Sequence, residues 1–180
     1  MKSLIITWTG FQDQEVVYPY YRLREEAANP ADVVIMSNII GRFHGIMGVN
    51  MDSHALTDDL KEPERCKHYL EKFDLLVLPG GVKALEKLRQ EKHVIDFIHE
   101  WNARKKIIAS TCHGAQLLIS ARVVAGRQVS AYYSIEDDLN NAGATYINAP
   151  VVIDGNLVSS PHYQWMGEWM HEAICACRES

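Results

Sequence analysis

The sequence predicts an α/β fold with a mostly parallel central sheet that helices cover on both faces. Short apolar runs rich in Ile and Val alternate with longer segments of helical period. The 180 residues, 47% hydrophobic and 23% charged, suit one globular domain, so we expect residues 1–180 to fold as a single domain. Residues 151–158, VVIDGNLV, place Asp-Gly-Asn between two apolar runs. That pattern predicts an antiparallel hairpin added to the parallel sheet.

Seven segments are predicted strands, and most of them are short and rich in Ile, Val or Leu. In chain order they are residues 3–8 (SLIITW), 32–37 (DVVIMS), 75–80 (LLVLPG), 106–111 (KIIAST), 127–132 (RQVSAY), 149–154 (APVVID) and 156–160 (NLVSS). Residues 41–60 are rich in Gly and lack a clean period, which favours loops or a small hairpin there.

Five longer segments between the strands are predicted helices. They are residues 14–28, 94–105, 114–124, 135–143 and 163–176. In the second of these, Val94, Phe97, Ile98 and Trp101 recur at helical spacing. One face of that helix is therefore expected to pack on the sheet.

Charge, hydropathy and cysteine spacing exclude several classes of protein. The formal net charge of −5 argues against nucleic-acid binding, which needs a basic face. The start MKSLIITWTG has no small-residue cleavage pattern, so we expect a strand and not a signal peptide. No segment approaches the roughly 20 apolar residues of a membrane span. The four cysteines form no C-x-x-C pair, which predicts no zinc site, no cofactor and a cytoplasmic protein with reduced thiols.

The strongest chemical signal is Cys112, which stands between the strand IIAST and an apolar helix. Ligands of open α/β sheets bind at the carboxyl ends of the strands, where each strand is followed by its helix. Ser110 and Gly114, two residues to either side, let strand and helix approach closely, as in a nucleophile elbow. The helix dipole favours a thiolate, so we expect the Cys112 thiol to have a lowered pKa and to be the fastest thiol to alkylate. The alternative is a small buried hydrophobe.

Three further residues are expected at the same edge of the sheet. Gly80 and Gly81 end the strand LLVLPGG, and their N–H groups can approach a ligand or complete an oxyanion hole with the N–H of His113. Glu15 begins the first predicted helix, so it emerges near Cys112 if both strands are parallel. A carboxyl group in that partly dry cleft is expected to hold a proton and to donate it to the sulfur.

At this point the sequence resembles the DJ-1/PfpI superfamily of class I glutamine amidotransferase-like folds, and most closely its PfpI-like intracellular protease branch. The resemblance spans nearly the whole chain. Five blocks carry it in the order of the family: EVVYPYYRLREEA, FDLLVLPGG, IIASTCHGAQLLISA, SIEDDLNNAGA and VVIDGNLVSS.

The resemblance implies a flavodoxin-like three-layer sandwich with a nucleophile elbow. It implies Cys112 as nucleophile, Glu15 as the glutamate that tunes the thiolate, His113 as base or oxyanion-hole donor, and Gly80 or Gly81 as the donor to the oxyanion. It also implies a homodimer or higher oligomer with its site near an interface. Reported activities of the family include peptide hydrolysis, glyoxalase III-like conversion of oxoaldehydes, contested deglycation, isonitrile hydration and redox sensing.

The sequence departs from the family pattern around this site. Where the PfpI-like branch has a glutamate after the Gly-Gly pair, this chain has Leu85, and Glu86 is one residue out of register. The sequence therefore leaves open whether a third acid completes a Cys-His-Glu triad. Where many relatives carry an arginine after two serines, this chain has Pro161 and His162, and Tyr133 stands where the branch often has proline.

Four residues are candidates for a substrate pocket: Tyr132, which matches a tyrosine of the PfpI-like branch, and His162, Tyr18 and His44. Tyr18, with its neighbours Tyr20 and Tyr21, is as compatible with core packing or an interface as with a pocket wall. His54 is a weaker candidate of the same kind as His44. The other histidines, on predicted helix surfaces, are expected to be solvated: His68, His93, His99 and His171.

Three functions of different classes follow. The first is a cysteine-dependent enzyme that attacks a carbonyl or amide carbon of a small molecule or short peptide, as a hydrolase or a glyoxalase. The second is a redox-responsive stress protein in which Cys112 oxidises. The third is a non-catalytic binding module, because a fold does not fix a function. His113 favours the cysteine-dependent enzyme. An isonitrile hydratase is a less favoured alternative, because a Thr at the position of His113 would suggest isonitrile hydration.

Overall fold

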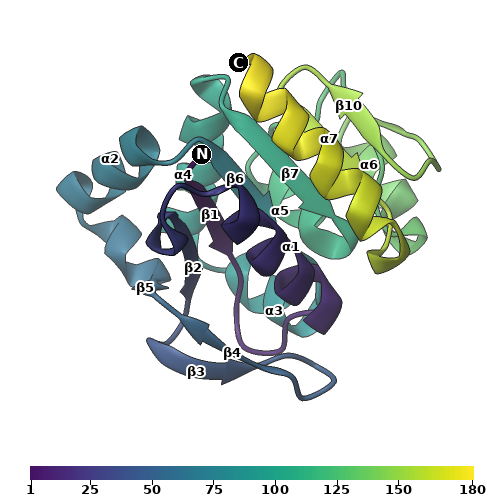
Figure 1. Cartoon of the computed structure of the whole chain (residues 1–180). Coiled ribbons are helices and arrows are strands. Elements are labelled where there is room, and N and C mark those ends of the chain that lie inside the picture. Colours follow the sequence, from purple (N-terminus) through teal and green to yellow (C-terminus); the bar gives the residue numbers. More distant parts are fainter.

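The computed structural model describes all residues of the chain, and a seven-stranded sheet forms its centre (Figure 1). The strands lie in the order β10-β11-β7-β6-β1-β2-β5. Their bounds are β1 (Ser3–Ile6), β2 (Val33–Ser37), β5 (Ala55–Leu56), β6 (Leu75–Leu78), β7 (Ile107–Thr111), β10 (Val152–Asp154) and β11 (Leu157–Ser160). All neighbouring pairs are parallel except the hairpin β10–β11, which is antiparallel, as the Asp-Gly pattern predicts.

The central strands are buried along their whole length because helices cover both faces of the sheet. Every residue of β1, β6 and β7 is buried. Figure 1 shows α1 (Asp13–Glu26) and α7 (Met166–Glu179) together on one face, with α3 (Val82–Leu88), α4 (Lys92–Ala103) and α5 (Ala115–Ser120) on the other. The predicted α/β sandwich, with a mostly parallel sheet between helices, is confirmed.

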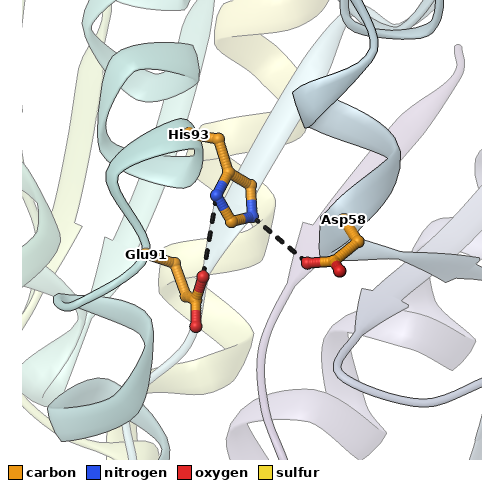
Figure 2. Close-up of side chains that lie close together, drawn as sticks. All are labelled: Asp58, Glu91 and His93. Atoms are coloured by element: carbon orange, nitrogen blue, oxygen red, sulfur yellow. Dashed lines mark ion pairs between the residues drawn. The ribbon is translucent and has the colours of Figure 1, made fainter.

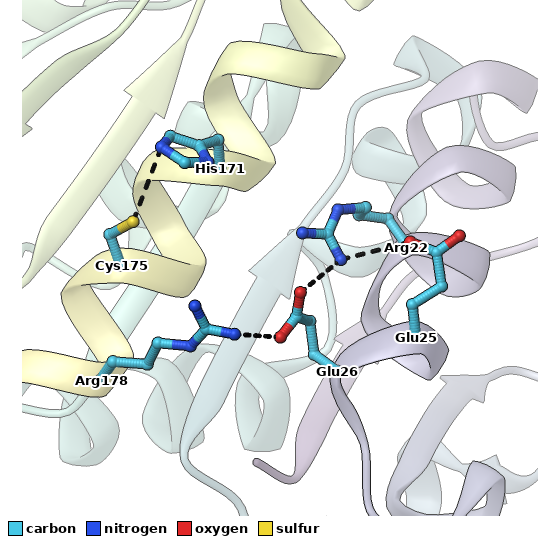
Figure 3. A network of polar contacts seen from close by, with 6 residues as sticks. All are labelled: Arg22, Glu25, Glu26, His171, Cys175 and Arg178. Carbon is cyan, nitrogen blue, oxygen red and sulfur yellow. Dashed lines mark hydrogen bonds and ion pairs between the residues drawn. The ribbon is translucent and has the colours of Figure 1, made fainter.

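A polar contact fixes the two helices of the first face to one another (Figure 3). Glu26 of α1 pairs with Arg178 of α7 and, at 2.7 Å, with Arg22 of its own helix. Trp169 fixes α7 to the sheet: it is fully buried, and its indole N–H donates to the carbonyl oxygen of Val158 in β11 at 3.2 Å. No helix of the protein combines the length and the apolar character that crossing a membrane requires.

Residues 41–60 contain the small hairpin β3 (Gly41–His44) and β4 (Asn50–Ser53), one of the two structures expected there. Several other elements differ from the sequence prediction. Strand β5 extends the main sheet and was not predicted. The segment 127–132 contributes only β8 (Gln128–Val129), which pairs with β9 (Thr145–Tyr146) outside the main sheet. The predicted helix 114–124 ends at Ser120, because Arg122 has a φ of 57°. Helix α2 (Pro63–Lys72) and helix α3 were not predicted, whereas α6 (Glu136–Asn141) was.

Candidate active site

Three neighbouring strands deliver the candidate catalytic residues to one edge of the sheet. Cys112 follows β7, Gly80 and Gly81 follow β6, and Glu15 lies in the first turn of α1, which follows β1. Since β7, β6 and β1 are adjacent and parallel, their carboxyl ends meet. The structure therefore places these residues together, as expected from the parallel sheet.

Cys112 occupies a sharp turn between strand and helix. Its φ of 54° lies in the left-handed region, which is costly for a residue with a Cβ and recurs at functional sites. The residue is only 7% exposed. A Cβ on Gly114 would overlap the carbonyl oxygen of Leu78, so only glycine lets the following helix pack this close to β6. The elbow geometry that the sequence predicts is present.

Glu15 is fully buried beside the sulfur. Its Oε2 accepts the N–H of Gly80 at 2.7 Å, and its Oε1 has no hydrogen-bonding partner. The carboxyl group and the Cys112 side chain lie on either side of Gly80, so the two groups are neighbours. Burial raises the pKa of the carboxyl from 4.5 to about 7, against the opposing effects of the Gly80 and Cys112 hydrogen bonds. Near neutral pH the group can therefore both give and take a proton.

Gly80 and Gly81 play different parts in the structure. The N–H of Gly80 is already bonded to Glu15, so it is not free to serve an oxyanion. A Cβ on Gly80 would lie 2.5 Å from the Glu15 Oε2 and 2.8 Å from the Cys112 Cβ. The N–H of Gly81, like that of His113, faces the sulfur. Of the two glycines expected to form an oxyanion hole, only Gly81 keeps a free donor.

The prediction of a lowered pKa for the Cys112 thiol is wrong, because Cys112 is buried next to Glu15. Burial raises the pKa of the thiol most, and the negative charge of an ionised Glu15 raises it further; the N–H groups of His113 and Gly81 act in the opposite direction. The expectation of a lowered pKa rested on the helix terminus alone, whereas the buried carboxyl acts in the opposite direction. The two groups ionise as one coupled pair, so a thiolate forms most readily while Glu15 still holds its proton.

His113 lies within reach of the nucleophile through its side chain. Its Nδ1 is 3.2 Å from the Cys112 sulfur, and its Nε2 is 3.4 Å from the Ser134 hydroxyl. Burial lowers the pKa of the imidazole, which keeps it neutral and able to accept a proton at pH 7. The Ser134 hydroxyl contacts Nε2, the ring nitrogen that the acid of a Cys-His-Glu triad would contact. Ser134 was not predicted, because a serine in a polar segment carries no signal of its own.

A pocket of about 420 Å³ opens over the sulfur. Tyr132 and His162 line it, as expected, and the Tyr132 ring lies 4.8 Å from the His113 ring. Tyr18 and His44 do not line it: Tyr18 belongs to a separate hollow on α1, and His44 is exposed on β3. The pocket also includes residues that were not predicted, namely Gln12, Ile46, Val82 and Tyr163.

Neither Leu85 nor Glu86 places an acid in the pocket over Cys112. Residues 82–88 are helical, so Leu85 and Glu86 lie about 100° apart around the helix axis. Leu85 is fully buried, whereas Glu86 is exposed and lines a different hollow with Val82 and Arg89.

Two histidines outside the pocket have structural surroundings. His54 accepts the N–H of Ile35 at 3.0 Å, so it holds β2 and does not line the pocket over Cys112. His93 was expected to be solvated, but its side chain is only 12% exposed, between Asp58 and Glu91 (Figure 2). One ligand atom from each of these three residues lies within 4.8 Å of the others. Lys61, 2.8 Å from Asp58, opposes a bound cation there.

The remaining cysteines lie far from this site in the fold. Cys66 lies in α2, and Cys175 and Cys177 lie in α7, where Cys177 packs against the core. Cys175 Sγ is 3.7 Å from His171 Nε2 on the outer face of the helix (Figure 3). Burial raises the pKa of Cys66 and Cys177, the latter to about 12. Neither of these two thiols is predisposed to form a thiolate.

Comparison with known proteins places this geometry in a family. The model of the DJ-1/PfpI family matches residues 1–176. Deglycase PH1704 of Pyrococcus horikoshii is 40% identical over 174 residues, which cover 97% of this chain and 98% of the relative. Deglycase PfpI of Pyrococcus furiosus is 38% identical over the same shares of the two chains.

Solved structures agree in fold. A protein of Anabaena variabilis with DJ-1/ThiJ/PfpI-like and ferritin-like domains superimposes with a TM-score of 0.86 at 25% identity; the match covers 97% of this chain and 49% of that one. DJ-1 of Schizosaccharomyces pombe superimposes with a TM-score of 0.82 at 17% identity, over 99% of this chain and 97% of the other. The flavodoxin-like layered arrangement that the resemblance implies is confirmed.

Proposed function

The chain belongs to the DJ-1/PfpI family, and from that premise we propose that it is a cysteine-dependent enzyme that attacks the carbonyl carbon of a small molecule or short peptide. One observation carries the proposal: a cysteine on a left-handed turn has a neutral imidazole on one side and a buried, proton-holding carboxyl on the other. A nucleophile, a base and an acid are thereby within reach of one sulfur atom.

The proposed first step is attack of the Cys112 sulfur on the carbonyl carbon. His113 takes the thiol proton, an S–C bond forms, and the carbonyl π electrons move to oxygen. The N–H groups of Gly81 and His113, which face the sulfur, are the donors for that oxyanion. Glu15 gives a proton to the oxygen or takes one from it, because its pKa of about 7 lies near the working pH.

Two outcomes follow from this adduct. With an amide, the C–N bond breaks, the amine leaves with a proton from His113, and water then hydrolyses the thioester. With an α-oxoaldehyde, the hemithioacetal loses its C–H proton and the neighbouring carbon gains one, which gives a hydroxy thioester; water releases a hydroxy acid. Both reaction routes balance with water as the only added reactant, so neither route requires a cofactor.

The names of the relatives bear on the choice of substrate. The archaeal proteins that cover nearly the whole chain are named deglycases. We therefore include adducts of α-oxoaldehydes with amines or thiols among the proposed substrates, next to the free aldehydes and small amides. We further propose a cytoplasmic homodimer or higher homo-oligomer that folds as one DJ-1/PfpI-like domain.

The test is a turnover panel with purified protein against methylglyoxal, its amine and thiol adducts, fluorogenic peptides and small amides. The Cys112→Ala variant serves as the blank for each substrate. Turnover of one class that disappears in the blank supports the proposal and names the reaction. Equal rates for both proteins on every substrate would contradict an enzyme that depends on Cys112.

A second candidate function is redox sensing, and the protonated Glu15 beside the sulfur favours it, since that group can donate to an oxidised sulfur. General stress protein 18 of Bacillus subtilis is 38% identical over 81 residues, 45% of this chain. Mass spectrometry after graded hydrogen peroxide would show a sulfinate on Cys112 that Glu15→Gln makes rarer. Over-oxidation of Cys112 at equal rates in both proteins would contradict this role.

A further inference from the structure

A second pocket adjoins the one that holds Cys112. Its volume is about 400 Å³, and its walls are largely aromatic: Tyr132, Tyr133, Tyr146, His162 and Trp165. The wall residues come from three separate segments of the chain, the turn after β8, the end of β9, and the connection from β11 to α7. We name this the aromatic pocket.

The aromatic pocket and the catalytic pocket share two wall residues, Tyr132 and His162. Their rings lie 5.9 Å apart and are nearly parallel, and the Tyr132 ring is also 4.8 Å from His113. A substrate with its carbonyl at the Cys112 sulfur therefore has a continuous aromatic wall leading into the second pocket. Together the two volumes are within the range of small-molecule sites, roughly 300 to 1,000 Å³.

The lining of the aromatic pocket selects against charge. None of its side chains is acidic or permanently cationic, and burial lowers the pKa of His162, so that ring is neutral at pH 7. A charged group would lose hydration here without meeting a counter-ion. The side-chain amides of Asn148 and Gln164 make no hydrogen bond within the protein, so both can bond to a neutral polar group.

Ring faces are available for stacking. Tyr133 is 68% exposed and Trp165 is 36% exposed, although both are large and apolar. Tyr133 lies 4.4 Å from Tyr132, so it continues the stack of rings that begins at His113. Planar groups gain most from such surfaces, because offset or edge-on contacts between rings are favourable beyond their buried area.

We propose that the aromatic pocket is a substrate subsite that takes an uncharged aromatic group, joined through a short amide-bearing or similar neutral linker to the carbonyl that Cys112 attacks. The inference rests on the proposed function, because it assumes that the substrate's carbonyl lies at the sulfur. It narrows the substrate class from any small carbonyl compound to those that carry a neutral ring a few bonds away.

Alkylation of Cys112 by chloroacetamides tests the subsite without knowledge of the natural reaction. The sulfur displaces chloride, so one S–C bond forms as one C–Cl bond breaks, and the thiol proton passes to His113 and from there to solvent. The reagents carry N-benzyl, N-phenethyl or N-phenylpropyl groups, and an N-ethyl reagent is the reference. The measurement is the ratio of each aryl rate constant to the N-ethyl rate constant, read by mass spectrometry of the Cys112 peptide.

We expect at least one aryl reagent to react about fivefold to tenfold faster than the reference, as one or two ring contacts allow. Trp165→Ala or Tyr133→Ala should reduce that ratio toward one, and Trp165→Phe should largely keep it. Ile153→Ala, which removes an exposed apolar side chain on β10, is the control and should keep the full ratio. Equal rates for all reagents, or an advantage that survives both alanine variants, would overturn the subsite.

A binding measurement separates this inference from the proposed function. The Cys112→Ser protein is titrated with N-phenethylacetamide, which cannot react, and saturation-transfer NMR reads the binding. Binding that Trp165→Ala abolishes supports the subsite even if Cys112 fails to alkylate, an outcome that would count against the nucleophile alone. No binding to either protein would overturn the subsite, while the turnover panel would still decide the function.

Discussion

Glu15 and Cys112 are buried together, and near neutral pH they compete for one proton. Full ionisation of both is opposed by burial and by the repulsion of two negative charges. The carboxyl is held by the N–H of Gly80, so it cannot turn away from the sulfur. The reactivity of this cysteine is consequently a property of the pair and not of the helix terminus alone.

Replacing Glu15 by Gln should affect turnover and alkylation in opposite directions. Gln keeps the shape but cannot exchange a proton, so turnover should fall about 10²-fold or more. The same change removes the charge that raises the Cys112 pKa, so the pH midpoint of iodoacetamide alkylation should move down. Stopped-flow alkylation across pH and steady-state turnover measure the two effects. Unchanged turnover and an unchanged midpoint would reject the pairing.

The same carboxyl predicts how stability depends on pH. The folded pKa of Glu15, about 7, is above its ordinary value of 4.5, so its contribution is fully present below about pH 4.5 and is lost as pH rises through about 7. Between about pH 5 and 8 this amounts to about 2–3 kcal/mol. Urea unfolding of the native protein and of Glu15→Gln at both pH values is the measurement. The native protein should lose more stability, and equal losses would contradict the raised pKa.

At the scale of the element, the elbow depends on one close approach between strand and helix. A methyl group on Gly114 would overlap the Leu78 carbonyl oxygen, and such overpacking costs about 1–3 kcal/mol. Gly114→Ala should therefore lower the melting temperature and slow alkylation of Cys112. Gly167→Ala is the matched control: it lies inside α7 with only the Tyr18 hydroxyl at 3.9 Å, so Ala should stabilise that helix by about 0.5–1 kcal/mol. Equal melting temperatures for the two variants would contradict the close approach.

The sequence predicts elements well where one physical signal dominates. The Ile- and Val-rich runs give β1, β2, β6 and β7, and the Val94 to Trp101 periodicity gives α4. It fails where two signals conflict. Helix α2 is strongly charged, and α3 has only seven residues and directly follows two glycines, so neither was recognised as a helix. The end of α5 at Ser120 depends on the left-handed Arg122, which no residue type announces.

The candidate site shows the same division. Strand order alone brings Glu15, Gly80 and Cys112 together, because parallel strands end at one edge. Sequence spacing does not predict which glycine keeps a free N–H, or that the Ser134 hydroxyl contacts His113. Both depend on contacts within about 3.5 Å. Tyr18 was a candidate for the pocket wall because the first helix is rich in aromatic residues, yet it lines a separate hollow and not the pocket over Cys112.

At the scale of the whole molecule, several departures from the family pattern lie in one pocket. In the family pattern that the sequence resembles, a proline often stands at the position of Tyr133, and an arginine often follows the two serines, where this chain has Pro161 and His162. All three residues line the aromatic pocket. In this chain that wall carries no acidic or permanently cationic side chain. The change of residue type therefore concerns one surface, the one that we propose selects the substrate.

A second large hollow of the molecule exposes several apolar side chains next to the polar residues Gln14, Arg22 and Glu25. Tyr18, Tyr21, Met47 and Val49 line a hollow of about 770 Å³ between α1 and the β3–β4 hairpin, and they are 38%, 55%, 72% and 43% exposed. Asp13 fixes the hairpin turn to α1 by accepting the N–H groups of Met47 at 2.7 Å and Val49 at 2.8 Å, so the surface is preformed. We name it the α1–hairpin surface. Apolar patches of this kind mark interaction sites.

The proposed homo-oligomer provides the partner for that surface, and Ile46 of the same hairpin also lines the catalytic pocket. Light scattering at micromolar concentration should therefore give a mass at least twice the 20.4 kDa of one chain. Tyr21→Glu and Met47→Glu should each shift the protein toward monomer, because a buried, unpaired charge at an interface costs several kcal/mol, roughly 2–5. Ile153→Glu, on the exposed β10 edge, should leave the mass unchanged. A monomeric native protein, or glutamate variants that keep the native mass, would mean that two copies of the α1–hairpin surface do not meet.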